Sequence, residues 1–512
     1  MNQAAELKEQ LLKGITRARA EVYKVGAVTP LQHIELPELP VPIWVKREDV
    51  SPIKAYKWRG AFNAISQLSD ERRASGVFAA SAGNHAQGVA LACQYLQCKA
   101  VIYMPTSTPK VKQNEVKRIG REWVTVMLIG DNYDEASDAA QLAAKQQGSA
   151  YIHPYDNIDV ISGQGTLADE IVMSGMGPFN RVYIAIGGGG MASAVSVLLK
   201  FYWPEIEVIG VEGVNQASMQ KAIDCGEPTA LDYIDVFCDG TAVRKVGDNT
   251  YKLCREHLDR IITVTNEEVC SAVRSFWETL RVTPEPSGAM GLAAILKDHK
   301  QNPLKEGDKP LTVLCGANMD FAQIGKIATQ ARHSSYSQMT YRIPVPDKNG
   351  ALVELLSGLP DGVGIGDMQY GYAQRGTQYP VISLAVDTER VESVRSSLSQ
   401  AFPLAEELDS HPMRQYRMIH FSRELLTHPE FLEVEFPERA GALKAFMQEV
   451  SAYASLFYFN YQYSGERVGR ALLGVDYQTD ENRQVVRELI EGLIPRVVRS
   501  VTPVHDEMAL EK

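Results

Sequence analysis

Short apolar runs alternate with segments of helical periodicity from about residue 22 to residue 314. The apolar runs have the length and β-branched content of strands. We predict strands at Ile43–Lys46, Gly76–Ala79, Ala100–Met104, Trp123–Ile129, Val182–Ile186, Val208–Glu212 and Leu311–Leu314. We predict helices at Arg59–Leu68, Asn84–Leu96, Tyr133–Gln147 and Gly163–Met173. This alternation indicates an α/β fold with a parallel sheet, in which ligands bind beyond the carboxyl ends of the strands.

The pattern changes near Gln330 and then repeats itself. The first copy predicts strands at Thr340–Val345, Ile365–Tyr372 and Val381–Val386, and helices at Ala351–Leu356 and Glu389–Phe402. The second copy predicts strands at Phe431–Phe436, Leu456–Tyr463 and Arg470–Tyr477, and helices at Ala442–Val450 and Asn482–Leu493. Two ferredoxin-like βαββαβ units account for this order, and a single irregular α+β domain is the alternative.

The composition narrows the class of protein. The 512 residues suffice for three or four domains of about 150 residues each. A net charge of −11, without a block of five like charges, predicts no nucleic-acid partner. The seven cysteines form no CxxC pair, which argues for a reducing, cytoplasmic location and against a disulfide framework or zinc ribbon. The segment Met1–Arg19 lacks the apolar core of a signal peptide.

One uncharged stretch, Val182–Leu199, reaches the length at which a membrane span becomes a candidate. Four consecutive glycines, Gly187, Gly188, Gly189 and Gly190, interrupt it, and each glycine destabilises a helix by about 1 kcal/mol relative to alanine. A strand, a glycine loop and a helix therefore explain the stretch better, and we predict no membrane partner. Four residues without Cβ can turn their N–H groups inward around one phosphate, although a tight structural turn is the alternative.

Three other segments carry candidate chemistry. Lys57 has apolar neighbours that would lower its pKa by desolvation, as an imine-forming lysine requires, whereas most helix lysines are solvated charges. The small-residue turn Ser81–Gly88 opens a helix and suits a carboxylate, although a plain N-cap at Ser81 is the alternative. Cys315 ends a predicted strand, either as a site residue or as a buried structural thiol. Together with the glycine loop, these features indicate a pyridoxal phosphate enzyme.

At this point the sequence resembles the threonine/serine dehydratases, which belong to the tryptophan-synthase-β-like, fold-type II group of pyridoxal phosphate enzymes. The resemblance covers roughly residues 20–330. Its motifs, in order, are Thr29-Pro-Leu31, Lys46-Arg-Glu-Asp49, Tyr56-Lys57-x-Arg59-Gly60-Ala61, Ser81–Gly88, Gly163-Gln-Gly-Thr166, Gly187–Gly190, Glu285-Pro-Ser-Gly-Ala289 and Gly316-Ala-Asn318. The doubled tail is similar to the paired ACT-like regulatory region of the biosynthetic threonine dehydratases.

The resemblance implies a role for each matching residue. Lys57 would bind pyridoxal 5'-phosphate as an imine and move the substrate's α-proton, with Tyr56 beside it. Asn84 would contact the phenolic oxygen of the cofactor, and Cys315 would face its pyridine nitrogen as a neutral thiol. Gly187–Gly190 would hold the phosphate. The substrate carboxylate would lie against the loop of Ser81, Ala82, Gly83, Asn84 and His85.

The resemblance also implies the reaction, conversion of L-threonine to 2-oxobutanoate and ammonia as the first step of isoleucine biosynthesis. It further implies feedback inhibition by isoleucine, relief by valine and a tetramer or dimer, whereas a tail that serves only assembly is the alternative. The expected domains are a catalytic region at 1–330, with a smaller lobe inserted at about 50–155, and regulatory units at 336–406 and 429–505.

Some positions depart from the family pattern. Ala55, Trp58 and Thr283-Pro284 differ from the residues that the family usually has at these positions. In the family these positions lie near the substrate's side of the cofactor. Another β-hydroxy or β-substituted amino acid is therefore an alternative substrate. Ala82 stands where racemases of this group carry a serine, which disfavours racemisation because alanine transfers no proton. The acidic residue expected after Glu212 is missing, so we predict no required metal. A non-catalytic amino-acid sensor is the alternative from another functional class.

Overall fold

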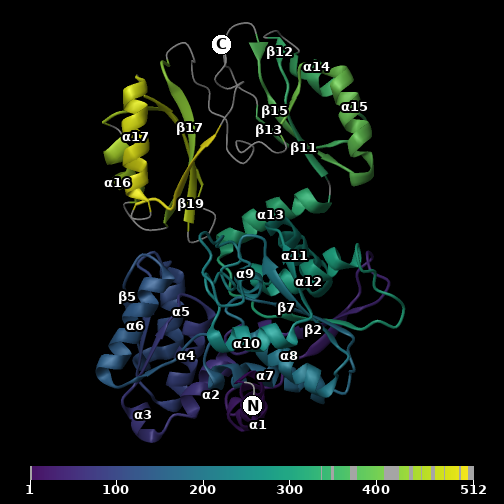
Figure 1. The fold of residues 1–512 in the computed structure, drawn as a ribbon. Helices are drawn as coiled ribbons and strands as arrows, with labels where there is room; N and C mark the ends of the chain where they lie inside the picture. The colour runs from purple at the N-terminus through teal and green to yellow at the C-terminus, as the bar shows by residue number, and fades with distance from the viewer. Residues whose placement is uncertain are drawn as a thin grey trace. The chain divides into compact units, whose positions relative to one another are not determined.

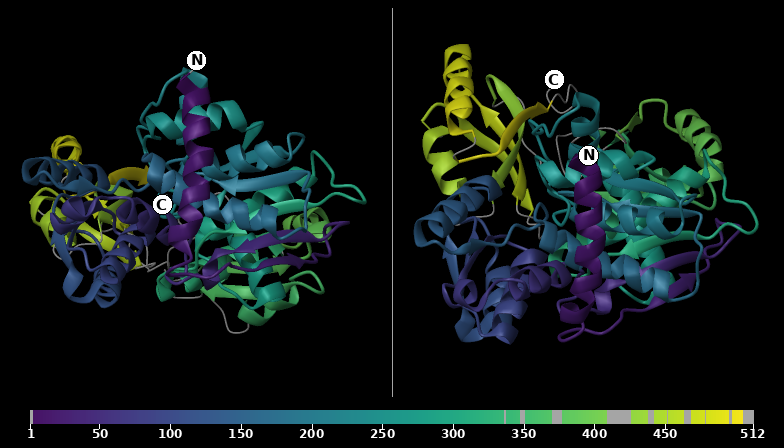
Figure 2. Two further views of the ribbon diagram at one scale, coloured as in Figure 1. Left: turned by 90° about the horizontal axis from the view of Figure 1, so that it is seen from below. Right: turned by 60° about the horizontal axis from the view of Figure 1, so that its bottom comes forward.

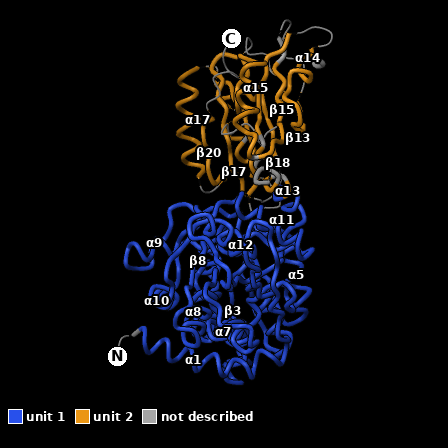
Figure 3. The backbone as a smooth tube through the Cα atoms, turned by 90° about the vertical axis from the view of Figure 1, so that its right-hand side faces the viewer, with its two compact units in different colours: residues 1–327 blue, residues 328–512 orange. Residues whose placement is uncertain are grey.

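The computed structural model describes residues 3–335, 337–346, 351–369, 377–408, 426–437, 442–450, 452–462, 468–477, 479–494 and 497–504. The chain divides into two compact units, residues 1–327 and 328–512, which Figure 3 distinguishes by colour. Among the described helices, none has the length and apolar character needed to cross a membrane.

A six-stranded sheet in the order β1-β2-β10-β7-β8-β9 forms the larger lobe of the first unit (Figure 1). Its strands are β1 (Leu31–Ile34), β2 (Ile43–Arg47), β7 (Arg181–Ala185), β8 (Glu207–Gly213), β9 (Arg260–Val264) and β10 (Pro310–Leu314). All neighbouring strands are parallel except β1, which pairs with β2 in antiparallel fashion. The central strand β10 is buried along its whole length, as a strand covered on both faces requires.

A four-stranded parallel sheet in the order β5-β4-β3-β6 forms the smaller lobe. Its strands are β3 (Val77–Ala80), β4 (Ala100–Met104), β5 (Val124–Leu128) and β6 (Ala150–Tyr151). Each lobe has a separate core of buried apolar side chains. All seven strands predicted for this unit are therefore confirmed, within two residues at each end, whereas β1, β6 and β9 had no prediction.

Helices surround both sheets. They are α1 (Gln3–Val22), α2 (Trp58–Ser66), α3 (Asp70–Ala74), α4 (Asn84–Leu96), α5 (Lys110–Gly120), α6 (Tyr133–Gln147), α7 (Ile158–Met173), α8 (Gly190–Tyr202), α9 (Ser218–Cys225), α10 (Asp248–His257), α11 (Asn266–Leu280), α12 (Pro286–His299) and α13 (Phe321–Ser335), with short 3-10 turns at η1 (Glu48–Val50) and η2 (Arg121–Trp123). The long helix α1, drawn in purple in both views of Figure 2, packs against α7. The four predicted helices correspond to α2, α4, α6 and α7.

The second unit contains two four-stranded sheets of the same design. The first has the order β13-β15-β11-β16 and the second β18-β19-β17-β20, so each copy places its strands in the order second, third, first, fourth. The elements of the first copy are β11 (Ser337–Arg342), β12 (Val345–Pro346), α14 (Ala351–Ser357), β13 (Gly364–Gln369), β14 (Thr377–Gln378), β15 (Val381–Val386), η3 (Thr388–Arg390), α15 (Val391–Ala401) and β16 (Glu406–Glu407). Those of the second are β17 (Pro429–Pro437), α16 (Ala442–Val450), β18 (Ser455–Gln462), β19 (Val468–Asp476), α17 (Asp480–Leu493) and β20 (Ser500–Val504).

Two βαββαβ units are thus confirmed, and a single irregular domain is excluded. The strand predicted at Thr340–Val345 extends beyond the observed strand, because β11 ends at Arg342 and the chain then forms the separate short strand β12. The glycines expected at the two strand-to-helix turns, Gly350 and Gly441, lie outside the described residues.

Candidate active site

A pocket with an empty volume of about 440 Å³ lies in the first unit, where strands of both lobes end. It is lined by Tyr56, Lys57, Asn84, Tyr155, Ala185, Gly187, Gly188, Gly189, Gly190, Met191, Ala192, Gly240, Thr241, Glu285, Ser287 and Cys315. Segments that follow β2, β3, β6, β7 and β10 all contribute to this lining. The expectation that the chemistry lies beyond the carboxyl ends of parallel strands therefore leads to this pocket.

Lys57 is a half-buried amine without an ion pair or hydrogen bond to the described residues. It immediately precedes α2, and the preceding residue is tied to the opposite wall, because the Tyr56 N–H donates to the Cys315 carbonyl over 3.1 Å. Burial lowers the pKa of Lys57 to about 8, partly opposed by the nearby Cys315 and Glu285. A fraction of this amine is therefore neutral near pH 7, as a nucleophile or proton acceptor requires.

The glycine loop leads from β7 into α8. In the described part of the chain, the N–H groups of Gly188, Gly189, Gly190 and Met191 have no hydrogen-bond acceptor. These donors lie at the positive end of the α8 dipole, which suits an anion. The loop can thus form the phosphate cradle expected from the sequence.

Neighbouring residues explain why this loop consists of glycines. A Cβ at Gly188 would lie 2.2 Å from Cγ of Tyr155, and one at Gly187 would lie 3.0 Å from Cα of Thr241. Gly189 has a φ of +92°, a conformation that side chains disfavour. Glycine is therefore required both by the close packing around the loop and by the presentation of the loop's N–H groups.

Cys315 follows β10 and is buried in the pocket wall. Its thiol lies 3.5 Å from the Ser287 carbonyl oxygen, to which it donates. Burial and the nearby Glu285 raise the pKa of the Cys315 thiol well above its usual range. The thiol is therefore neutral and supplies no negative charge. Its single hydrogen would have to turn away from the Ser287 carbonyl to be donated to a pyridine nitrogen.

Asn84, the first residue of α4, belongs to a closed set of hydrogen bonds with two residues of the large lobe. Its Nδ2 donates to Glu285 Oε1 over 2.8 Å, and its Oδ1 accepts from Asn318 Nδ2 over 2.8 Å. The Asn318 N–H donates to the other oxygen of Glu285 over 3.1 Å. This arrangement fixes the amide orientation and leaves one N–H of Asn84 Nδ2 for a ligand.

The rest of the Ser81–His85 loop lies outside the pocket lining. Ser81 accepts the Gly83 N–H over 3.1 Å, which makes a local turn before α4. His85 Nε2 donates to the Ile152 carbonyl over 2.8 Å, while its buried Nδ1 has no hydrogen-bond partner among the described residues. Burial, assisted by Lys57, lowers the pKa of His85 to about 3, so the ring is neutral at physiological pH. Among Ser81, Ala82, Gly83, Asn84 and His85, the structure brings Asn84 to the pocket.

The residues that depart from the family pattern do not line the pocket. Trp58 is fully buried and packs against Gly26, where a Cβ would lie 2.1 Å from its ring. Ala55 is held by Ser51, whose Oγ donates to the Ala55 carbonyl and accepts its N–H. Neither these residues nor Thr283 and Pro284 are in the pocket lining. These residues therefore do not belong to the lining that contains Lys57 and the glycine loop.

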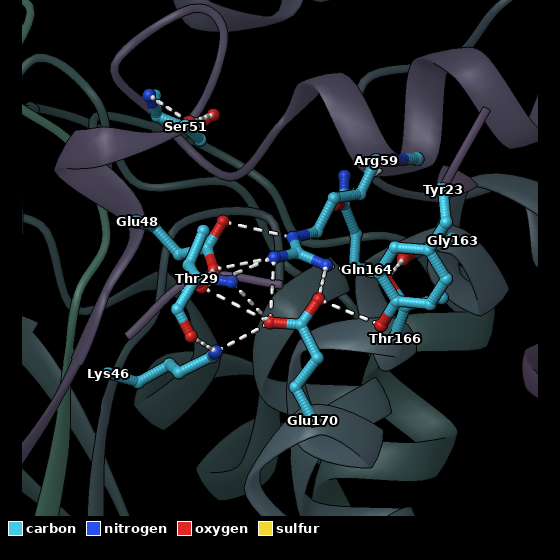
Figure 4. Close-up of polar contacts among 12 residues, drawn as sticks. Tyr23, Thr29, Lys46, Glu48, Ser51, Arg59, Gly163, Gln164, Thr166 and Glu170 are labelled. Carbon is cyan, nitrogen blue, oxygen red and sulfur yellow. Dashed lines mark hydrogen bonds and ion pairs between the residues drawn. The ribbon is translucent and has the colours of Figure 1, made fainter. Parts of the chain in front are cut away.

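Arg59, two residues after Lys57, belongs to a buried cluster of four charged side chains, shown in Figure 4. Arg59 donates to both carboxyl oxygens of Glu48 and of Glu170 at 2.6 to 3.1 Å. Lys46 donates to Glu170 over 2.5 Å, and Thr29 and Tyr23 complete the hydrogen bonds of the carboxylates. These contacts join β2, α2 and α7, and hence fix the start of the helix that Lys57 precedes.

Glu212, in β8, contacts the start of α9. Its carboxylate accepts the N–H groups of Met219 and Gln220 over 2.8 and 2.9 Å, at the start of α9. Burial raises the pKa of Glu212 to about 7. Within the described residues, no group of three or more His, Cys, Asp or Glu side chains is arranged to hold a metal ion.

Glu285 and Tyr155 are among the lining residues that were not predicted as site residues. Burial, with a contribution from Asp239, raises the pKa of Glu285 to about 8. Its motif, Glu285-Pro-Ser-Gly, contributes to the family resemblance but does not by itself indicate a role for the glutamate. Tyr155 follows the two-residue strand β6, which is too short to show a periodic pattern, so no local signal pointed to it.

The donor set fits pyridoxal phosphate. An unpaired amine is available for the aldehyde, free N–H groups for the phosphate, one amide N–H for the phenolic oxygen and a neutral thiol for the ring nitrogen. Lys57, Asn84, the glycine loop and Cys315 supply these groups, and all of them line one pocket. Their individual roles remain proposals.

Comparisons with known proteins agree with this chemistry. Residues 22–316 match the family described as pyridoxal-phosphate dependent enzyme, and residues 424–509 match the C-terminal regulatory domain of threonine dehydratase. The biosynthetic L-threonine dehydratase of Haemophilus influenzae is 35% identical over 94% of this chain and 93% of its own.

Solved structures also resemble the chain, among them a threonine deaminase and a serine racemase. The processed form of threonine deaminase isoform 2 from Solanum lycopersicum has a TM-score of 0.60 and 36% identity, covering 63% of this chain and 94% of its own. Maize serine racemase has a TM-score of 0.58 and 27% identity, covering 62% of this chain and 96% of its own.

Proposed function

Because the chain belongs to the family of pyridoxal-phosphate-dependent enzymes, we propose that it converts L-threonine to 2-oxobutanoate and ammonia. The unpaired, half-buried Lys57 in one pocket with the glycine loop is the observation that carries this proposal. The similarity to biosynthetic threonine dehydratases over nearly the whole chain supports threonine as the substrate.

The residues of the pocket have distinct tasks in this reaction. When bound, pyridoxal phosphate stabilises negative charge at the substrate's Cα. Lys57 Nζ takes the proton from Cα, which its lowered pKa permits. Loss of the β-hydroxyl as water and hydrolysis of the resulting enamine then release the keto acid and ammonia. The neutral Cys315 thiol adds no charge that would favour transamination over elimination.

The loop before α4 has the task of holding the substrate carboxylate. Ser81, Ala82, Gly83, Asn84 and His85 form a small-residue turn at a helix start, where backbone N–H groups favour an anion. Ala82 has no group that transfers a proton from the second face of Cα. Elimination therefore remains favoured over racemisation, although a serine racemase shares the fold.

A keto-acid assay on the purified protein tests the proposal. L-Threonine is expected to give the highest kcat/KM among threonine, serine and β-substituted analogues, with 2-oxobutanoate as its product. Lys57→Ala is expected to lower turnover by about a thousandfold or more and to remove the imine absorbance band. Lys110→Ala, at an exposed lysine of α5, is the control that retains both. A wild-type protein that binds no pyridoxal phosphate would refute the proposal.

The alternative substrate is another β-hydroxy or β-substituted amino acid. The departures at Ala55, Trp58 and Thr283-Pro284 suggested it, but these residues do not line the pocket. The same assay decides, because a higher kcat/KM for such an analogue than for threonine would favour the alternative.

The second unit is proposed to regulate the first. The match of residues 424–509 to a regulatory domain of threonine dehydratase supports a regulatory role. The sequence resemblance implies feedback inhibition by isoleucine and relief by valine. We expect a homotetramer or dimer in the cytoplasm, and the seven free thiols suit a reducing compartment. Isoleucine should inhibit the full chain and lose this effect when residues 335–512 are deleted. If isoleucine does not inhibit the intact enzyme, regulation is refuted and the tail serves only assembly.

A further inference from the structure

Thr250, on α10, contacts the glycine loop without lining the pocket. Its side chain is fully buried, and its Oγ1 lies 2.6 Å from the Gly188 carbonyl oxygen. The same hydroxyl lies 3.1 Å from the carbonyl of Gly247 and accepts the Gly247 N–H over 3.1 Å. Because a hydroxyl has one hydrogen, the shorter contact identifies Gly188 as its acceptor.

This hydrogen bond sets the direction of a peptide group in the glycine loop. The Gly188 carbonyl and the Gly189 N–H belong to one planar trans peptide, in which they point in opposite directions. Thr250 holds the carbonyl on its own side. The Gly189 N–H is therefore directed away from Thr250, toward the side on which Gly188 and Gly189 line the pocket.

A glycine peptide needs such a contact to keep its orientation. Gly189 has a φ of +92° and is flanked by glycines, so little intrinsic preference prevents the 188–189 peptide from turning over. A turned peptide would present its carbonyl oxygen, rather than an N–H, to a phosphate. Holding the peptide before the ligand arrives removes an ordering cost from binding.

Thr250 is itself held in place by Asp156, which lies between β6 and α7. The Asp156 carboxylate accepts the N–H groups of Asp248, Asn249 and Thr250 over 3.0, 2.9 and 3.2 Å, which caps the start of α10. The neighbouring Tyr155 packs its ring against Gly188. The glycine loop is thus in contact with the Tyr155 ring, and its Gly188 carbonyl is in contact with the capped start of α10.

We propose that Thr250 is a positioning residue for the cofactor phosphate, acting through the orientation of the Gly188–Gly189 peptide. The proposal rests on the assignment of Gly187–Gly190 as the phosphate cradle. Thr250 acts on the phosphate alone, so its loss should weaken ligands that carry a phosphate and spare those that do not.

The test is a titration of apoenzyme with pyridoxal 5'-phosphate and, separately, with unphosphorylated pyridoxal. Thr250→Val removes the hydroxyl while keeping the shape of the side chain. We expect it to raise the Kd of pyridoxal phosphate about fivefold to tenfold, the factor that one ordinary hydrogen bond represents. The Kd of pyridoxal should not change. Thr250→Ser, which keeps the hydroxyl, should restore wild-type binding of the phosphorylated ligand.

Thr312→Val is the matched control, because Thr312 is also buried and donates to a backbone carbonyl, that of Tyr183, away from the pocket. It should change neither Kd. If Thr250→Val does not fold, the Kd values of Thr250→Ala and Thr250→Ser are compared instead, because these two variants also differ by the hydroxyl.

Unchanged pyridoxal phosphate affinity on loss of the hydroxyl would overturn the role of Thr250, as would an equal loss for both ligands. A wild-type enzyme that binds both ligands equally well would instead refute the cradle itself.

Discussion

Asn84 and Glu285 are joined by a 2.8 Å hydrogen bond although 201 residues separate them in the chain. Asn84 begins α4 in the smaller lobe, and Glu285 immediately precedes α12 in the larger one. The contact therefore connects the lobes within the pocket wall. It also places a buried acid close to Lys57, since Glu285 is among the groups that affect the pKa of that lysine.

The raised pKa of Glu285 predicts a pH dependence of stability. The group binds its proton in the folded state up to about pH 8 but loses it near pH 4.5 when unfolded. Between these values the unfolded state binds fewer protons, so stability falls as pH rises, by up to about 1.4 kcal/mol per pH unit. Glu285→Gln should flatten the fall of the apoenzyme's thermal midpoint between pH 5 and pH 8.

The exposed Glu267 supplies the control for this measurement. Glu267→Gln should leave the pH profile of the thermal midpoint as in the wild type. If Glu285→Gln retained the wild-type slope as well, Glu285 would be ionised in the folded protein and the prediction would be wrong.

The buried cluster of Lys46, Glu48, Arg59 and Glu170 should be sensitive to the loss of a single charge. Arg59→Met would leave two carboxylates buried with one remaining cation, which is expected to destabilise the first unit by about 3 to 5 kcal/mol. Urea unfolding followed by fluorescence measures this loss.

Arg118→Ala is the control for the cluster. This variant breaks an exposed pair with Glu115 and should unfold as the wild type does. Equal stability of Arg59→Met and Arg118→Ala would show that the buried cluster does not hold α2 in place.

The sequence predicted those parts of the fold that have a local periodic signal. The strands ending before Gly187 and Cys315 are short, mainly apolar runs, and these runs correctly located the glycine loop and the thiol at strand ends. The strand β1 was missed because Leu31–Ile34 is partly exposed on one edge of the sheet and shows no regular alternation.

The rest of the site depends on contacts between distant segments. Tyr155 reaches Gly188, and Glu285 reaches Asn84, only because two lobes meet at one pocket. No spacing along the chain encodes these contacts. For the same reason, the sequence could not show that Trp58 packs against Gly26 rather than toward the pocket.

His85 should destabilise the protein in acid. Burial lowers its pKa from 6.5 to about 3, so the unfolded state binds the extra proton first as pH falls. Stability is therefore lost between pH 6.5 and pH 3, again by up to about 1.4 kcal/mol per pH unit. His85→Gln, which keeps a donor for the Ile152 carbonyl, should reduce the difference between thermal midpoints at pH 7 and pH 4.5. A difference as large as that of the wild type would show that another group causes the acid sensitivity.

Cys315 provides the sharpest test of how the pocket controls the reaction. The buried thiol is neutral, so a pyridine nitrogen beside it gains no charge partner and remains largely unprotonated. Cys315→Asp would add that partner, and we expect threonine turnover to fall at least about tenfold, equivalent to about 1.4 kcal/mol of barrier. Cys315→Ser keeps a neutral donor and should retain activity. Turnover is measured at full cofactor occupancy, established from absorbance, so that weaker binding is not counted as slower chemistry. Unchanged turnover in Cys315→Asp would show that the charge at this position does not decide between elimination and transamination.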